Sequence, residues 1–321
     1  MRDAARVPWG LGPAARAEAG RPIAGFVRRV RAYLREMFPL PPRLGLALLL
    51  YAAFARLLAR LHGWPTGPGL ADLALGAGSA LATMLVLRLM DELKDQDVDR
   101  ALFADRPLPS GRVLVSDIRV SLALVSAAFV AAHLGRGLAL WSALGVLGYA
   151  GLMFRWFFVP GRMRPRLLLT LATHNPVIAV LLVHLAVLAA AARGRRVGEV
   201  EGAALAAVVV LFWAPAFAWE IARKIRAAEE ENAYVTYSRV LGRAGAVSVV
   251  AAAQTLALLL AVVLTRRHGL HVAALFCIGG GWLLAQAAHA RFLLRPDARS
   301  SRLRPFAEVF LLSVLLAGLV A

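Results

Sequence analysis

The sequence predicts an all-α membrane protein with nine transmembrane helices. Hydrophobic residues make up 60% of the 321 residues, and the mean hydropathy is +0.67. A soluble domain usually has roughly 45–50% apolar residues. Runs of about twenty apolar residues, long enough to cross a bilayer as a helix, recur along most of the chain. The single cysteine, Cys277, excludes a disulfide framework and a cysteine-based metal site.

A basic leader at residues 1–42 precedes the apolar runs, and the runs make up a nine-helix domain at residues 43–321. The leader contains FVRRVRAYLREMF between Phe26 and Phe38, which predicts a short amphipathic helix on the membrane surface. We expect no signal peptide, because the leader lacks an apolar core. The approximate bounds of the nine runs are 43–61, 69–90, 114–134, 138–158, 166–190, 203–221, 244–264, 270–290 and 306–321.

The formal net charge of +18 is distributed between the apolar runs rather than over a soluble face. This pattern predicts topology determinants that face anionic lipid, and it argues against nucleic acid as a partner. The loops after the even-numbered runs carry more arginine and lysine than the loops after the odd-numbered runs. The positive-inside rule then places the N-terminus and the even loops in the cytoplasm, and the C-terminus outside.

The stretch from Arg88 to Gly111, RLMDELKDQDVDRALFADRPLPSG, holds six of the nineteen acidic residues. In a continuous helix, Glu92, Asp95 and Asp99 share one side, with Arg88 on the same edge. Carboxylates that converge at a membrane boundary need a cation between them. Mg²⁺ prefers oxygen ligands and usually takes one or two carboxylates together with substrate phosphates. We therefore predict a Mg²⁺ site, with a solvated, charged helix end as the alternative.

A second acidic stretch, WEIARKIRAAEEENAYVTYSRVLG at residues 219–242, follows the sixth run. It comes four spans after the first stretch, so both are predicted on one side of the membrane. Glu220, Lys224 and Glu231 share a helical face if the helix continues. Carboxylates interleaved with Lys224 and Arg223 suit a metal–diphosphate site, in which the cations bind phosphate oxygens. The alternatives are a solvated loop for the Glu229–Glu231 triplet and, for Glu220 with Lys224, a helical pair that contributes about 0.2–0.5 kcal/mol.

Polar residues also lie inside the fifth run, just before Pro176. Polar groups within a span usually face the interior of a helix bundle. One interpretation is acceptor binding, with His174 as a base, and the other is hydrogen bonding between helices around a proline-disturbed helix. Tyr149, near the end of the fourth run, is a further candidate to line the interior. The polar residues of the fifth run are Thr170, Thr173, His174 and Asn175.

The first acidic stretch resembles the first signature of the UbiA-type intramembrane prenyltransferases, N-D-x-x-D-x-x-x-D followed by R-P-[LI]-P-x-G. Asp91 stands at the asparagine position and Glu92 at the first aspartate, and Asp95 and Asp99 match the later two. Arg106 opens the matching RPLPSG. The second stretch is similar to the second signature in position, but the aspartates of that signature are absent.

The resemblance implies a central cavity among nine helices, in which Mg²⁺ assists the ionisation of a prenyl diphosphate. A lipophilic or aromatic acceptor, such as a quinone precursor, would then attack the allylic carbocation. Membrane lipids are the surrounding partners, and the protein is expected in the cell inner or plasma membrane with its site loops on the cytoplasmic side. The expected catalytic residues are Asp95, Asp99, Glu92 and Lys224; the substrate-binding residues are Arg88, Lys94, Arg106, Arg223, Tyr149, His174 and Asn175; and the metal ligands are Glu92, Asp95, Asp99, Glu220, Glu229 and Glu231.

Two other functions are consistent with the same sequence. A non-catalytic protein of the same fold would bind an isoprenoid or lipid without turnover. An ion-coupled transporter would use intramembrane carboxylates, and it predicts acidic residues in the middle of spans rather than at one membrane face.

Overall fold

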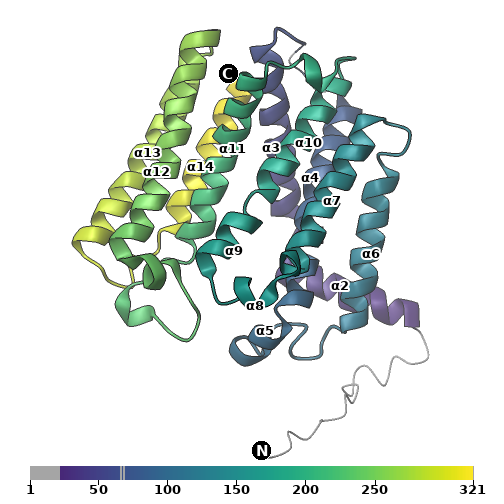
Figure 1. The fold of residues 1–321 in the computed structure, drawn as a ribbon, viewed down its shortest axis with the longest axis vertical. Coiled ribbons are helices and arrows are strands. Elements are labelled where there is room, and N and C mark those ends of the chain that lie inside the picture. Colours follow the sequence, from purple (N-terminus) through teal and green to yellow (C-terminus); the bar gives the residue numbers. More distant parts are fainter. Residues whose placement is uncertain (1–21, 66, 68, 321) are drawn as a thin grey trace, which may run out of the picture. The chain divides into compact units, whose positions relative to one another are not determined.

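The computed structural model describes residues 22–65, 67 and 69–320, and over these ranges the chain forms helices and no strand. Residues 1–21, half of the predicted leader, lie outside the described residues. Figure 1 shows the order of the helices along the chain. The α-helices are α2 (Pro22–Met37), α3 (Leu40–Leu61), α4 (Leu70–Lys94), α5 (Gln96–Leu102), α6 (Val115–Ala131), α7 (Leu138–Phe154), α8 (Pro160–Met163), α9 (Leu167–His174), α10 (Val177–Ala191), α11 (Gly202–Ala222), α12 (Tyr237–His268), α13 (Val272–Leu294) and α14 (Arg304–Val320).

Each of the nine predicted apolar runs contains a long helix, and the amphipathic segment of the leader forms α2. The fifth run is interrupted after His174, where two residues separate the end of α9 from the start of α10. Pro176 lacks an N–H and its ring excludes a normal helical turn, which explains why the run breaks here. The protein is therefore all-helical over the described residues, as the sequence predicts.

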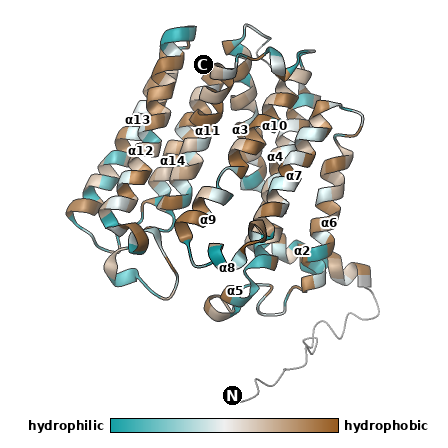
Figure 2. Cartoon of the chain, viewed as in Figure 1, coloured by the Kyte–Doolittle hydropathy of each residue, from teal (hydrophilic) through white to brown (hydrophobic). Residues whose placement is uncertain are grey.

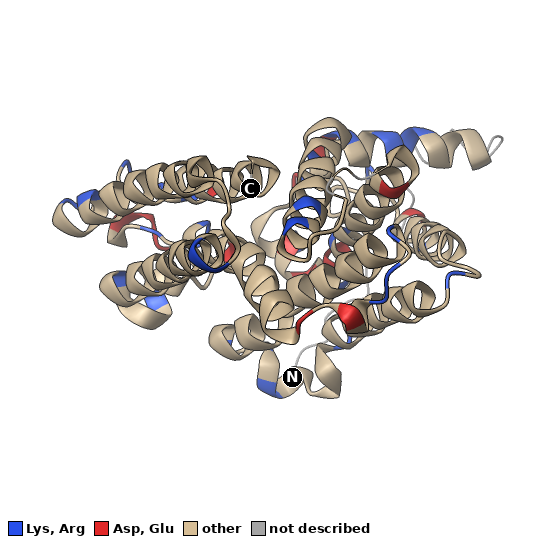
Figure 3. Cartoon of the chain, turned by 90° about the horizontal axis from the view of Figure 1, so that it is seen from above, with Lys and Arg blue, Asp and Glu red and all other residues tan. Residues whose placement is uncertain are grey.

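Six helices of the described chain are long and apolar enough to cross a membrane, which supports a multi-pass membrane protein. Apolar residues cover much of their length in Figure 2, and charged residues are a minority of the ribbon in Figure 3. α6, α7 and α14 have 17 residues each, fewer than the roughly twenty that usually span a bilayer. Nine spans and a cytoplasmic N-terminus therefore stay predictions. The six are Leu40–Leu61, Leu70–Lys94, Leu167–Ala191, Gly202–Ala222, Tyr237–His268 and Val272–Leu294.

The contacts within the chain divide it into two compact units, and the division does not follow the predicted leader. Of the residues that the structure describes, the first unit contains 22–43 and 84–128, and the second contains 44–65, 67, 69–83 and 129–320. The leader helix α2 thus belongs with the end of α4 and with the first acidic stretch. The core of the first unit consists of the buried side chains Tyr33, Leu89, Leu108, Val113 and Ile118.

The second unit is a bundle of apolar helices. α11 packs on α12 and α14, α12 packs on α13, α13 packs on α14, and α10 packs on α7 and α11. The rings of Phe54 and Phe212 meet edge to face, with 5.4 Å between their centroids, in the main core of this unit. Gly242, with φ of 72°, breaks the first turn of α12 from the rest of the helix. Only glycine adopts this backbone conformation without steric cost.

Small residues allow α13 and α14 to approach closely, as is common between membrane helices. A Cβ atom at Gly281 of α13 would lie 2.8 Å from the Cβ and 2.4 Å from the Oγ of Ser313 in α14. A Cβ atom at the neighbouring Gly280 would meet no atom within 4 Å. The two glycines therefore differ in packing although they are adjacent in one helix.

We expect Gly281→Ala to lower the melting temperature of the detergent-solubilised protein, because overpacking a tight contact costs about 1–3 kcal/mol. Gly280→Ala is the matched control and should leave the melting temperature unchanged or raise it, since alanine favours a helix by up to about 1 kcal/mol over glycine. Equal melting temperatures for the two variants would contradict the proposed contact.

Candidate functional site

The first acidic stretch is not one continuous helix. α4 ends at Lys94 and α5 begins at Gln96, and Asp95 between them has φ of −101° and ψ of 15°. Asp95 is an N-cap residue type, and aspartate favours such positions over the interior of a helix. The expectation that Glu92, Asp95 and Asp99 share one helical face is therefore corrected, because the chain changes direction at the middle residue.

Two carboxylates of this stretch are buried and each is paired with an arginine. Glu92, whose side chain is 0% exposed, forms an ion pair with Arg88 one turn earlier in α4. Asp99 in α5 accepts a hydrogen bond from Arg106 Nη1 at 2.7 Å. The Arg106 guanidinium also lies 3.9 Å from the centroid of the Phe103 ring. The pairing offsets the cost of burying each carboxylate away from water.

The other charged side chains of the stretch differ in exposure. The ammonium of Lys94 lies 3.4 Å from Asp91, and the lysine is mostly buried while the aspartate is half exposed. Asp97 is 92% exposed and pairs loosely with Arg100. Asp97 is therefore exposed to solvent, whereas Glu92 and Asp99 are buried. A substitution at Asp97 can serve as the control for substitutions at the buried acids.

The residues around Glu92 fit a metal–diphosphate site in part. Glu92 Oε2 is buried and accepts no hydrogen bond, and Asp99 and Arg106 lie within its electrostatic range. Among residues 22–65, 67 and 69–320, no three acidic, histidine or cysteine side chains gather closely enough to hold one metal ion. Mg²⁺ needs only one or two protein carboxylates when substrate phosphates supply further oxygens. Glu92 and Asp99 meet that smaller requirement.

The leader helix α2 contributes to this cluster, which the sequence did not predict. The buried hydroxyl of Tyr33 lies in the electrostatic neighbourhood of Arg88 and Glu92. Tyr33 belongs to the apolar stripe of the amphipathic pattern, and that pattern alone does not distinguish a membrane surface from a protein surface. The structure places this part of the stripe in the core of the first unit.

Two ion pairs hold α2 against the rest of the first unit. Arg29 donates to both carboxylate oxygens of Asp117 in α6, at 2.6 and 2.8 Å, and Asp117 is buried. Arg112 donates to both oxygens of Glu36, at 2.7 and 3.0 Å, in a more exposed position. Hydrogen bonding to Arg112 lowers the pKa of the Glu36 carboxyl below its usual value. The pair therefore stabilises the fold above the ordinary glutamate pKa, and this contribution is lost as the pH falls through the lowered pKa.

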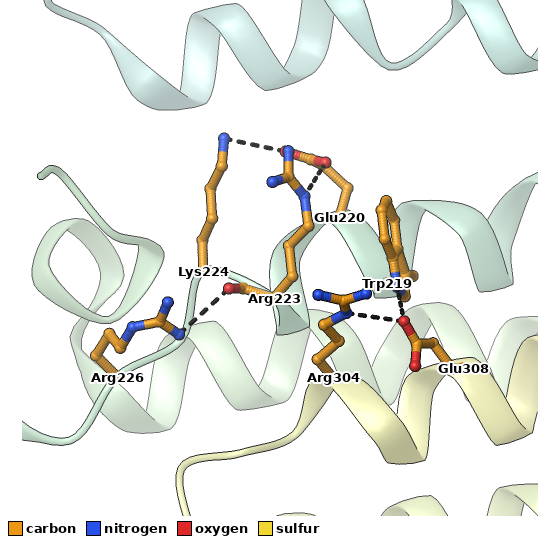
Figure 4. Close-up of polar contacts among 7 residues, drawn as sticks. All are labelled: Trp219, Glu220, Arg223, Lys224, Arg226, Arg304 and Glu308. Atoms are coloured by element: carbon orange, nitrogen blue, oxygen red, sulfur yellow. Dashed lines mark hydrogen bonds and ion pairs between the residues drawn. The ribbon is translucent and has the colours of Figure 1, made fainter. Parts of the chain in front are cut away.

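In the second unit, Glu220 lies near the end of α11 and accepts hydrogen bonds from two neighbouring cations (Figure 4). Arg223 donates to both carboxylate oxygens, at 2.6 and 2.9 Å. The Lys224 ammonium lies 3.1 Å from Glu220 Oε1, and 5.9 Å from the centroids of the Tyr234 and Tyr237 rings. This cluster combines one carboxylate, two cations and two aromatic rings at a helix terminus.

α11 ends at Ala222, so Glu231 does not continue the face of Glu220 and Lys224, and that conditional expectation is corrected. Glu231 instead accepts hydrogen bonds from the hydroxyls of Thr236, at 2.6 and 2.8 Å, and Ser238, at 2.8 Å. The backbone N–H of Tyr237 donates to the carbonyl of Lys224 and closes the loop. The helix stops because the chain turns back here to begin α12.

The remaining glutamates of the triplet, in the short 3₁₀ helix η3 (Ala228–Glu230), face the loop between α13 and α14. Glu229 accepts a hydrogen bond from the backbone N–H of Ala298 at 2.7 Å, and Glu230 accepts one from the Ser301 hydroxyl. The triplet therefore connects two loops of the second unit. The predicted role of Glu229 and Glu231 as metal ligands stays a prediction.

A third cluster surrounds His174 at the end of α9. The hydroxyl of Tyr149 in α7 donates to the carbonyl of Thr173 at 2.8 Å, and the rings of Trp156 and Phe157 lie 5.5 and 5.8 Å from the His174 ring. Asn175 is buried, and its Oδ1 accepts no hydrogen bond. The predicted residues Tyr149, His174 and Asn175 thus belong to one region.

The aromatic members of this region come from a strained turn, η1 (Trp156–Phe158). Trp156, Phe157 and Phe158 have φ of 51°, 49° and 62°. Non-glycine residues rarely adopt this left-handed conformation, and strained backbone is common at functional sites. No local sequence signal predicts the turn, because aromatic residues usually avoid positive φ.

Two solved structures resemble the fold over most of both chains. The apo structure of a UbiA homologue from Aeropyrum pernix K1 matches with a TM-score of 0.62 and 21% identity, over 85% of this chain and 96% of that chain. This chain has the UbiA fold. A structure of digeranylgeranylglyceryl phosphate synthase matches with a TM-score of 0.57 and 15% identity, over 91% of this chain and 99% of that chain. No family profile and no curated protein matches the sequence.

The likeness to UbiA confirms, at the level of the fold, the resemblance drawn from the first acidic stretch. The signature residues Glu92, Asp95, Asp99 and Arg106 lie around the end of α4 and in α5 and the loop after it. Their roles, and the roles of the residues in the second stretch, stay predictions, because a shared fold does not assign them.

The ion pairs of α2 give a test of how the first unit is held together. We expect Asp117→Asn to lower stability by about 2 kcal/mol, because hydrogen bonds to charged groups are worth about 1.5–3 kcal/mol when buried. Glu36→Gln is the matched amide substitution at an exposed pair and should cost less than about 1 kcal/mol. Melting temperature in detergent and tryptic cleavage within α2 measure both effects, and an equal loss in the two variants would contradict this assignment.

Proposed function

We propose that this protein is an intramembrane prenyltransferase that transfers an isoprenoid from a prenyl diphosphate to a lipophilic or aromatic acceptor. The observation that carries the proposal is the pair of buried carboxylates in the UbiA fold, Glu92 near the end of α4 and Asp99 in the short helix α5, each beside an arginine. Carboxylates and guanidinium groups close together suit a metal-bound diphosphate.

In this proposal, Glu92, Asp95 and Asp99 would hold Mg²⁺, and a bound Mg²⁺ would offset the negative charge that develops on the departing diphosphate. Arg88 and Arg106 bind phosphate oxygens directly. A guanidinium has five N–H donors, and the pairs with Glu92 and Asp99 leave most of them unused. Arg88 Nε is buried without a hydrogen-bond partner, which supports a role for it toward a ligand. Lys94 is the further cation of this set.

We also propose that Arg223 and Lys224 of the second acidic stretch bind phosphate oxygens, with Glu220 between them. Lys224 offers a compact positive charge to a phosphate oxygen, and Arg223 a planar pair of donors. Glu220 holds both cations in place before a ligand arrives. We leave Glu229 and Glu231 out of the proposed metal set, because their carboxylates accept hydrogen bonds that close the loop.

The residues around His174 are proposed to bind the acceptor or the isoprenoid. The faces of Trp156 and Phe157 attract cations, and they would stabilise a carbocation more strongly away from water. His174 is a candidate base for the proton that the acceptor loses on alkylation. Tyr149 fixes the backbone at Thr173 beside it.

Purified protein should release diphosphate from geranyl, farnesyl or geranylgeranyl diphosphate in the presence of Mg²⁺ and an acceptor, and chelation should stop the release. We expect Asp95→Asn and Asp99→Asn to reduce the rate at least about a hundredfold, since each would remove a carboxylate ligand of the Mg²⁺ that stabilises the leaving group. Asp97→Asn, in the same helix but exposed, is the matched control and should keep the wild-type rate. Absence of both release and metal-dependent binding for all three donors would refute the proposal.

Two sets of variants test the second acidic stretch. One set changes the charged residues around Glu220, and the other changes a glutamate that contacts a neighbouring loop. Glu220→Gln and Lys224→Gln should lower diphosphate release or raise the KM for the prenyl diphosphate by about tenfold or more, as expected when a charged ligand loses a partner. Glu230→Gln removes a charge from the loop contact with Ser301 and should lower the melting temperature while the KM stays constant. Wild-type diphosphate release together with an unchanged KM in the first two variants would exclude them from the donor site.

A non-catalytic binding protein of the same fold is the second candidate, favoured by the absence of a three-ligand metal cluster among the described residues. Metal-dependent binding of the donor without turnover would identify it. A transporter is less consistent with the structure. The acids of the long helices, Asp72, Asp91, Glu92, Asp117, Glu220 and Glu308, lie close to helix ends rather than in mid-span.

A further inference from the structure

We propose that the leader helix α2 and the start of α3 form a binding groove for one anionic glycerophospholipid. The groove has a volume of about 610 Å³ and lies within the first compact unit. This volume is in the usual range for small-molecule sites, roughly 300–1,000 Å³. Its lining includes the apolar side chains of Phe26, Val27, Val30 and Leu34, with Arg31 and Arg35 among them.

The two edges of the apolar stripe of α2 face different partners. At 100° per residue, Tyr33 and Val27 lie about 60° to either side of Val30. Beyond Tyr33, Arg29 and Glu36 bind Asp117 and Arg112, so this edge is occupied by protein.

The opposite edge, beyond Val27, carries Arg31 and Arg35, which both line the groove and are exposed. Neither makes an ion pair with any residue in the described part of the chain, residues 22–65, 67 and 69–320. Their positive charge is therefore available to an anionic ligand.

The position of the groove selects a lipid as that ligand. Leu40 lines the groove and is the first residue of α3, a helix long and apolar enough to cross the membrane. The groove thus adjoins the first residue of a candidate span, where we expect the lipid headgroups to lie. Val27 is 55% exposed and continues an apolar surface next to the arginines. Arginine binds phosphate through paired N–H donors, and the apolar wall suits the first part of an acyl chain.

Binding is measured by native mass spectrometry of the full-length protein with dioleoyl phosphatidylglycerol or dioleoyl phosphatidylcholine. We expect the anionic lipid to bind more tightly than the zwitterionic lipid. Arg31→Gln/Arg35→Gln should weaken phosphatidylglycerol binding roughly thirtyfold, since one basic residue at an anionic surface contributes about fivefold. Arg31→Lys/Arg35→Lys should retain most of the affinity, because the charge is kept.

The matched control is Arg266→Gln/Arg267→Gln at the end of α12, which removes the same charge from two exposed arginines. This control should bind phosphatidylglycerol as the wild type does. Val27→Glu keeps both arginines but places a carboxylate on the apolar wall, and it should also lose binding. Folding of each variant is checked by its melting temperature.

A photoactivatable phosphatidylglycerol should label peptides within residues 26–41 more than other parts of the chain. Equal affinity for the two lipids, an unchanged affinity in the Arg31→Gln/Arg35→Gln variant, or labelling spread evenly over the spans would overturn the proposal. None of these outcomes depends on prenyl transfer, so the lipid site and the proposed activity are tested separately.

Discussion

The pairing of carboxylates with neighbouring cations is the interaction on which the candidate site depends. Glu92 with Arg88, Asp99 with Arg106, and Glu220 with Arg223 and Lys224 all follow this arrangement. A charge at the edge of an apolar helix is costly unless a partner offsets the loss of water. The pairs therefore allow acids and cations to be concentrated beside apolar segments.

The fold class could be predicted from the sequence because the bilayer imposes a strong and local requirement. Backbone polar groups must be satisfied within each segment, so every long apolar run becomes a helix. The nine runs correspond to α3, α4, α6, α7, α9 with α10, α11, α12, α13 and α14. The first acidic stretch was also recognisable, because its acids and the RPLPSG segment have fixed spacings. The number of spans depends on the shorter helices, whose length alone does not decide whether they cross a bilayer.

The geometry of the acidic stretches was less predictable. Helical periodicity placed Glu92, Asp95 and Asp99 on one face, and it also extended α11 as far as Glu231. Both inferences assumed a continuous helix, and the chain instead breaks at Asp95 and stops at Ala222. The hydroxyl of Thr236 binds Glu231 after the chain turns back, and the hydroxyl of Ser301 binds Glu230 from another loop. Helical periodicity predicts neither contact. The contribution of Tyr33 likewise depends on tertiary packing, because an amphipathic stripe does not reveal what it covers.

The turn at Trp156, Phe157 and Phe158 has a consequence for the evolution of the fold. A left-handed residue with a side chain costs roughly 1–2 kcal/mol, whereas glycine would occupy the same backbone at almost no cost. Three aromatic residues in succession therefore maintain a conformation that is unfavourable in isolation, and neighbouring contacts must outweigh it. Substitution by glycine would relax the backbone but remove the rings beside His174. A substitution in this turn therefore changes two properties at once: the free energy of the backbone conformation and the packing of aromatic rings around His174.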